Sequence, residues 1–118
     1  MTHDDLEVRA SPMFPVADLD RALEHYAALG FLVSRWSEDY GFAAWRGLEL
    51  HLVVQPGHDP ASVFLHVPDA DEVFALWSAA GVGRTTAPES KPWGVREGDH
   101  FDGDGNRLRF GSPLASGG

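Results

Sequence analysis

The last strand-like run of the sequence carries the side chains with the clearest capacity for chemistry. Leu108 and Phe110 alternate with Arg107 and Arg109, so one face of a strand is apolar and the other presents guanidinium groups. Just before it, residues 102–106 read Asp-Gly-Asp-Gly-Asn, which are types that reverse the chain readily. The segment therefore predicts a hairpin with Arg109 on an open, uncovered face.

A histidine occupies a comparable position in the middle of the chain. His51 lies between Leu50 and Leu52, so it is expected on an open face, together with Glu49 two residues earlier. No nucleophile accompanies them, and we predict no catalytic relay there. The turn 102–106 lacks the distal glutamate of a calcium loop and is interpreted as a plain turn. Three scattered histidines are expected to be solvated: His3, His58 and His100.

Composition excludes several kinds of chemistry. The 118 residues include no cysteine, which rules out disulfides, thiolate nucleophiles and thiolate metal ligands. A formal net charge of -9 disfavours a nucleic-acid partner and favours a cationic one. No apolar run approaches the roughly 20 residues of a membrane helix, and the start does not resemble a signal peptide. We expect a soluble, cytoplasmic single domain spanning 1–118, with no membrane partner.

The elements that position these side chains follow a repeated order. In the first half, a strand is predicted over 7–16, a helix begins after the cap Asp18 and ends at Gly30, and three strands follow at 31–36, 40–45 and 48–54. The apolar stripe of this helix contains Leu19, Ala22, Leu23 and Tyr26.

The second half repeats that order after a Pro- and Gly-containing linker at 55–60. A strand at 62–67 precedes the cap Asp69 and a helix that ends at Gly81, and further strands are predicted over 82–86, 94–101 and 107–111. The apolar stripe of the second helix contains Val73, Leu76, Trp77 and Ala80.

The two halves are copies of one module. Four pairs of residues are separated by the same 51 positions: Val16 and Val67, Asp18 and Asp69, Tyr26 and Trp77, and Gly30 and Gly81. This spacing predicts an α+β fold of two tandem βαβββ modules, at 7–55 and 61–112, forming a curved mixed sheet with a cleft. Because each helix covers one face of its strands, we expect four open-face positions to converge: Ser11, His51, Ser62 and Arg109.

Several motifs occur in the order typical of one known family. They are Val-Ala-Asp-Leu-Asp-Arg-Ala at 16–22, Tyr26, Leu-Gly-Phe at 29–31, Pro-Trp-Gly at 92–94, Arg-Glu at 96–97 and Asp-Gly-Asn at 104–106. With these motifs the chain resembles the vicinal oxygen chelate superfamily, and within it the bleomycin resistance proteins. The resemblance implies a homodimer of paired modules. It also implies, from Pro12 in the first strand, an amino-terminal strand exchanged between the subunits.

Enzymes of this superfamily hold a divalent metal at the four convergent positions. This sequence departs from their pattern at Ser11, Ser62 and Arg109, and leaves His51 as the one side chain suited to a metal. A guanidinium cannot become a ligand, so we expect no metal, no cofactor and no catalytic residue. A further departure is Gly98, where the resistance proteins carry an aromatic residue.

Aromatic side chains are expected to line the cleft. By resemblance, a planar ligand would stack in a groove shared by two subunits. The predicted ligand-binding residues are Trp36, Tyr40, Phe42, His51, Ser62, Phe64, Trp93 and Arg109. This set favours a protein that sequesters a bleomycin-type antibiotic over an enzyme. The alternatives are a metal-dependent lyase or dioxygenase of the same superfamily and a binding protein for another small aromatic compound.

Overall fold

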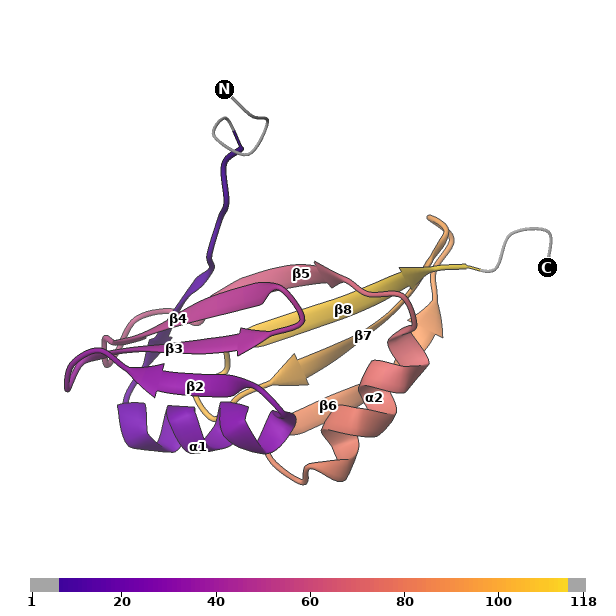
Figure 1. Cartoon of the computed structure of the whole chain (residues 1–118). Helices are drawn as coiled ribbons and strands as arrows, with labels where there is room; N and C mark the ends of the chain where they lie inside the picture. Colours follow the sequence, from indigo (N-terminus) through magenta and orange to yellow (C-terminus); the bar gives the residue numbers. More distant parts are fainter. Residues whose placement is uncertain (1–6, 115–118) are drawn as a thin grey trace.

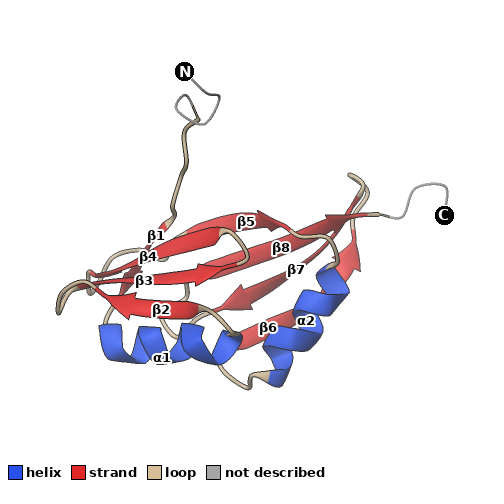
Figure 2. Ribbon diagram, in the orientation of Figure 1, coloured by secondary structure: helices blue, strands red, loops and turns tan. Residues whose placement is uncertain are grey.

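The computed structural model describes residues 7–114 and contains two four-stranded sheets, each with one helix (Figures 1 and 2). The elements are β1 (Met13–Val16), α1 (Leu19–Leu29), β2 (Leu32–Arg35), β3 (Tyr40–Trp45), β4 (Leu48–Val54), β5 (Ser62–His66), α2 (Ala70–Ala79), β6 (Arg84–Ser90), β7 (Val95–Phe101) and β8 (Arg107–Pro113).

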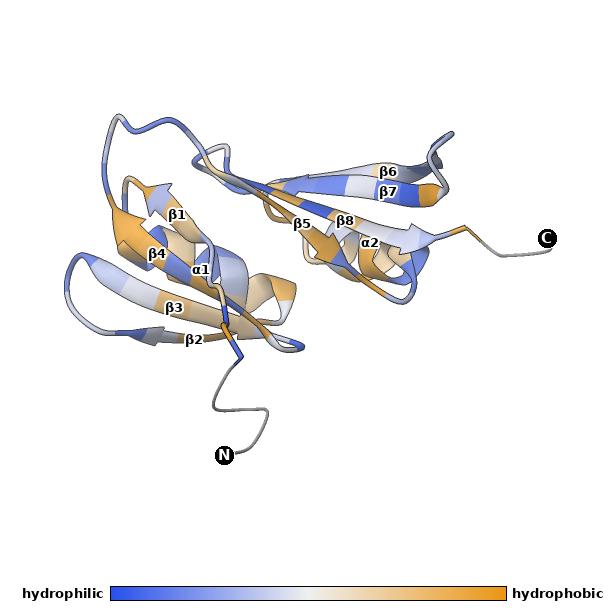
Figure 3. Ribbon diagram, turned by 90° about the horizontal axis from the view of Figure 1, so that it is seen from above, coloured by the Kyte–Doolittle hydropathy of each residue, from blue (hydrophilic) through white to orange (hydrophobic). Residues whose placement is uncertain are grey.

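The two sheets have the same topology. Their strand orders are β1-β4-β3-β2 and β5-β8-β7-β6. In each, the first strand pairs in parallel with the last, and the remaining pairs are antiparallel. Figure 3 shows the sheets lying side by side, and Figure 1 shows both helices on the same side of them. The predicted α+β fold of two βαβββ modules is therefore confirmed.

Both helices begin and end where the sequence predicts. The Asp18 carboxylate accepts the backbone N–H of Arg21, and Gly30 ends α1 with a φ of 103° that favours glycine. Asp69 caps α2 in the same way. The predicted stripe of α2 is wrong at Leu76, which is 41% exposed, because Ala70, Val73 and Trp77 turn the buried face away from it. Within residues 7–114, neither helix is long and apolar enough to cross a membrane.

Two strand boundaries differ from the prediction. The first strand begins at Met13 rather than residue 7, because Pro12 just before it cannot donate a ladder hydrogen bond. Residues 7–10 are exposed and extend away from the sheets (Figure 1). The strand predicted over 82–86 instead runs from Arg84 to Ser90, and its pairing with β7 shifts register between Thr86 and Glu89. Pro88 lies in this irregularity, where its missing N–H is tolerated.

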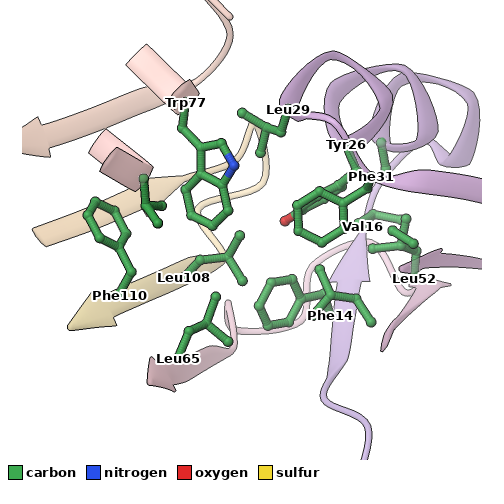
Figure 4. Close-up of a cluster of buried hydrophobic side chains, with 14 of the residues drawn as sticks. Phe14, Val16, Tyr26, Leu29, Phe31, Leu52, Leu65, Trp77, Leu108 and Phe110 are labelled. Atoms are coloured by element: carbon green, nitrogen blue, oxygen red, sulfur yellow. The ribbon is translucent and has the colours of Figure 1, made fainter. Parts of the chain in front are cut away.

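A single hydrophobic core joins the modules on the helix side of the sheets (Figure 4). Trp77 is fully buried at its centre, as predicted. Its ring lies 5.0 Å from the ring of Trp45 and 6.1 Å from that of Phe31, both in the first module. In its own module it meets Phe110 edge to face at 5.5 Å. The core therefore spans the boundary between the two modules rather than dividing at it.

A buried polar cluster also crosses that boundary; we name Tyr26, Asp102, Asp104 and Asn106 the Asp102 cluster. The Tyr26 hydroxyl donates to Asp102 at 2.7 Å. The Asn106 amide also donates to Asp102, and the backbone N–H groups of Asp104 and Asn106 do the same at 2.9 Å. Burial, followed by the charge of Asp102, raises the pKa of Tyr26 well above its ordinary value. The segment is therefore a turn, as its sequence predicts, and the structure shows that it also links the two modules.

Asn106 extends this cluster to both modules. Its side chain donates to the carbonyl of Pro15 at 2.9 Å and accepts the N–H of Ala61 at 2.8 Å. Asp104 accepts the N–H of Ala17 at 2.9 Å. One turn in the second module thus fixes the end of β1 and the entry to β5.

Substitution Asn106→Ala should destabilise the protein strongly. It leaves the Ala61 N–H and the Pro15 carbonyl without their partners, and buried polar groups left in this way cost about 1–3 kcal/mol each. Urea unfolding should show a loss of at least about 2 kcal/mol. The control is Gln55→Ala in the exposed linker, expected to change stability by less than about 0.5 kcal/mol. Equal losses in the two variants would contradict the bridging role of Asn106.

Candidate ligand-binding site

Each sheet has one face covered by a helix and one face left open. On the covered face Phe14, Val16, Leu50 and Leu52 are buried, as the alternation of the sequence predicts. Met13, on the opposite face of β1, is 56% exposed. Any ligand that binds to a sheet surface must therefore bind on these open faces.

The open face of the first sheet carries a compact polar and aromatic cluster around His51. The Tyr40 hydroxyl lies 2.7 Å from Nδ1 of His51, and Nε2 of His51 lies 3.3 Å from a carboxylate oxygen of Glu49. Phe42 packs edge-on against the imidazole, with ring centroids 5.0 Å apart. The structure thus brings together three of the predicted residues, Tyr40, Phe42 and His51.

These contacts assign a role to each imidazole nitrogen. The Glu49 carboxylate can only accept, so Nε2 of His51 donates to it and Nδ1 accepts from the Tyr40 hydroxyl. Neither ring nitrogen keeps a free lone pair for a metal ion. Glu49 and His51, for which we predicted no relay, are thus hydrogen-bonded to each other. The third member of this chain of contacts is the phenol group of Tyr40.

The open face of the second sheet centres on Arg109. Its guanidinium donates two hydrogen bonds to Asp99, at 2.9 and 3.0 Å, and one to the buried Glu97 at 3.4 Å. The hydrogen bonds that Arg109 donates to Asp99 come first among the causes that raise the pKa of Arg109 above its ordinary value. Two carboxylates thus surround one cation. Arg109 presents no unpaired positive charge to a ligand.

Phe64 and Ser62 lie on the neighbouring strand β5. Phe64 is beside Arg109 in the parallel pairing and remains 37% exposed. Its ring lies against Gly111, where an added Cβ atom would come within 2.6 Å of the ring. Ser62 pairs with Arg107, whose Nε donates to its hydroxyl at 3.0 Å. The Phe64 ring can therefore occupy this position only because Gly111 has no side chain.

The two remaining predicted residues lie in turns. Trp36 follows β2 and is 78% exposed, and Trp93 precedes β7 and is 66% exposed. Both rings lie at ends of strands rather than on the sheet surface. We name Trp36 and Trp93 the rim tryptophans.

The predicted convergence of four positions does not occur within the chain. His51 belongs to one sheet and Arg109 to the other, and each makes its polar contacts within its own sheet. The register also differs, because Ser62 pairs with Arg107 and Phe64 pairs with Arg109. In the first sheet Met13, not Ser11, pairs with His51. The parallel pairing thus places Ser11 and Ser62 two residues away from the partners of His51 and Arg109.

One histidine prediction is also wrong. His100 is fully buried rather than solvated, because its position on β7 points under the sheet toward Trp77. His58 is exposed as expected, and His3 lies outside the described residues.

Sequence reasoning missed Glu97 and Asp99, although a signal was present. A hairpin closed at 102–106 places Asp99 opposite Arg109, and the period of two then places Glu97 on the same face.

The donor set does not fit the divalent metal that enzymes of this fold use. A serine hydroxyl is a poor ligand, a guanidinium is none, and both nitrogens of His51 are engaged. Within residues 7–114, no group of three or more His, Cys, Asp or Glu side chains is arranged to hold a metal ion. No chemical step through a metal follows from this site.

The fold is similar to that of several solved structures. A bleomycin resistance determinant encoded on the transposon Tn5 has a TM-score of 0.82 at 26% identity, covering 92% of this chain and 100% of that chain. A bleomycin-binding protein in complex with bleomycin has a TM-score of 0.81 at 26% identity, covering 90% and 98%. A glyoxalase-related enzyme from Clostridium phytofermentans, at 20% identity, shares the fold with a TM-score of 0.75 over 92% and 97%. No protein-family model matches the chain, and no curated protein does.

Replacing Arg109 should destabilise the protein, because Glu97 and Asp99 would lose the cation that they share. Arg109→Gln leaves Glu97 buried without a cation, and we expect a loss of about 2 kcal/mol in the free energy of unfolding, measured with urea at pH 7. The matched control is Arg107→Gln. Arg107 is more exposed and lies 3.8 Å from Asp99, so its loss should cost less than about 1 kcal/mol. Similar losses in the two variants would argue against a special pairing at Arg109.

Proposed function

We propose that this chain, which belongs to the vicinal oxygen chelate superfamily, binds and sequesters a bleomycin-type glycopeptide antibiotic without metal or catalysis. Such a ligand would lie in an aromatic, acidic cleft formed at a homodimer interface. The similarity in fold to a bleomycin resistance determinant and a bleomycin-binding protein supports this proposal. The cytoplasmic location predicted from the sequence is part of it.

The observation that carries the proposal is the chemistry of the open faces. Their exposed rings, at Phe64 and at the rim tryptophans Trp36 and Trp93, offer stacking surface for a planar group. Among the polar side chains there, the carboxylates of Glu49 and Asp99 are partly exposed, and Arg107 donates to the Ser62 hydroxyl. Arg109 is fully engaged by two carboxylates, and Glu49 is partly exposed with one oxygen toward His51. Negative potential beside aromatic faces suits a flat, cationic guest.

The alternative functions differ in what they require of the same site. A metal-dependent lyase or dioxygenase would need a free imidazole nitrogen, and the Tyr40 and Glu49 contacts of His51 argue against that role. A binding protein for another small aromatic compound would use the same rings. Competition among flat cationic and neutral ligands separates it from the antibiotic-binding protein.

Dimer formation is supported by what one chain leaves uncovered. Met13 and Phe64 are exposed on the open faces, and residues 7–10 extend away from the rest of the described chain (Figure 1). A second copy would cover both faces and give the extended arm a strand to pair with. The proposed cleft then lies between the first sheet of one subunit and the second sheet of its partner.

Tryptophan fluorescence provides the test of binding. Titration with metal-free bleomycin should give a saturable change at roughly micromolar concentration. Trp93→Ala should weaken binding about ten-fold, because a stacking partner is lost. The control Leu76→Ala, on the exposed side of α2, should leave the affinity unchanged. The absence of any saturable change in the unsubstituted protein would exclude the antibiotic as the ligand.

Light scattering tests the dimer. We expect twice the mass of one chain at the concentration used for the titration, because the exposed apolar faces favour association. A monomer at that concentration would rule out a cleft shared by two subunits, whatever the outcome of the titration.

A further inference from the structure

Two histidines meet at the module boundary, on the helix side of the sheets and away from the open faces. His25 lies on α1 in the first module and His100 on β7 in the second, and their Nε2 atoms are 2.8 Å apart. The second nitrogen of His100, Nδ1, lies 2.7 Å from the Thr85 hydroxyl. These contacts form a continuous path from one module through two imidazoles to strand β6 of the other.

The surroundings of this pair leave it little freedom. His100 is fully buried and packs edge to face against Trp77, with ring centroids 5.7 Å apart. A Cβ atom at Gly83 would lie 2.7 Å from Cε1 of His25 and 3.0 Å from Nε2 of His100, so only glycine fits there without displacement. The two rings are therefore held together by close packing from the second module.

The number of protons on the two rings decides whether a hydrogen bond can form between them. When both rings are neutral, one Nε2–H donates to the other Nε2. When His25 is protonated, its Nε2–H can still donate, provided that the proton of His100 moves to Nδ1 and donates to the Thr85 hydroxyl. When both rings are protonated, two N–H groups face each other at 2.8 Å and no hydrogen bond remains. The contact thus tolerates one charge and not two.

We propose that the His25–His100 contact is an acid-operated latch between the modules, closed when the pair carries no charge or one charge and open when both rings are protonated. An open latch separates the two imidazole rings and loosens their packing against Trp77, while the strands of each sheet and the Asp102 cluster stay in place. This device is independent of any ligand and of the proposed function.

The pKa directions agree with this geometry. Burial, followed by the charge of His25, lowers the pKa of His100 to about 4. Burial also lowers the pKa of His25, against the raising effect of Asp102 and Asp104. Both values lie below that of an unfolded histidine, so the contact contributes its full stability above roughly pH 6.5 and loses it as the pH falls toward about 4.

Other groups around the pair are charged or titratable and enter the same balance. Arg21 and His25 line a cavity of about 260 Å³ together with Asp18, Asp102 and Asp104. Tyr26 stays protonated, since its pKa is raised. From β6, the Arg84 guanidinium lies over the Phe101 ring at 4.2 Å, beside Thr85 in sequence. The negative charges of Asp102 and Asp104 favour binding of the first proton to the histidine pair. Binding of a second proton is opposed by the positive charge of the first.

Two substitutions should move the transition in opposite directions. His25→Gln keeps a hydrogen-bond acceptor for His100 and removes one charge, so the latch should open at a lower pH, by on the order of one unit. Thr85→Val removes the acceptor that the singly charged state needs, so the latch should open at a higher pH. His58→Gln, in the exposed linker, is the control and should leave the midpoint unchanged.

Circular dichroism from pH 7 to pH 3.5 gives the measurement. Near-ultraviolet signal reports the packing of Trp77 against His100, and far-ultraviolet signal reports the strands and helices. We expect the near-ultraviolet signal of the unsubstituted protein to change at a higher pH than the far-ultraviolet signal. Coincident loss of the two signals, or one midpoint shared with His25→Gln and Thr85→Val, would overturn the proposal. If one variant fails to fold at pH 7, the direction of shift in the other still decides.

Discussion

The structure depends on the carboxylate of Asp102 more than on any other polar group. It accepts the Tyr26 hydroxyl, the Asn106 amide and two backbone N–H groups, while Asn106 reaches both Pro15 and Ala61. A buried charge of this kind is stable only when its hydrogen bonds are complete. The modules are therefore locked to each other by a turn, and the aromatic core around Trp77 is assembled against that fixed frame.

With the helix side closed in this way, the two open faces are left for interactions with other molecules. Their polar groups are already paired within each sheet, His51 with Tyr40 and Glu49, and Arg109 with Asp99. In this pairing the lone pairs that could bind a metal ion are already used in hydrogen bonds. What stays available is ring surface beside partly exposed carboxylates, which is the basis of the proposed ligand class.

Local periodicity in the sequence was enough to predict the helices, their caps, the repeat and the buried face of each sheet. Several of its failures share one cause, which is pairing between distant segments. The offset that places Phe64, not Ser62, beside Arg109 depends on the register of parallel strands. The contact of His25 with His100 joins positions 75 residues apart, and no local pattern encodes it. Glu97 and Asp99 could have been found by counting back from the turn, because hairpin register is local.

The polar pairs on each open face are complete within one module, and this has an evolutionary consequence. A substitution on the first sheet leaves no charged group on the second sheet without its partner. The two halves of the surface can therefore change independently. Specificity could then drift in one copy while the other preserves an ancestral contact. Two glycines are the demanding positions: Gly83 on the helix side, where an added side chain would collide with the histidine pair, and Gly111 on the open face, where it would collide with Phe64. Sequence variation in descendants of this gene should therefore be permissive at the polar pairs and strict at these two glycines.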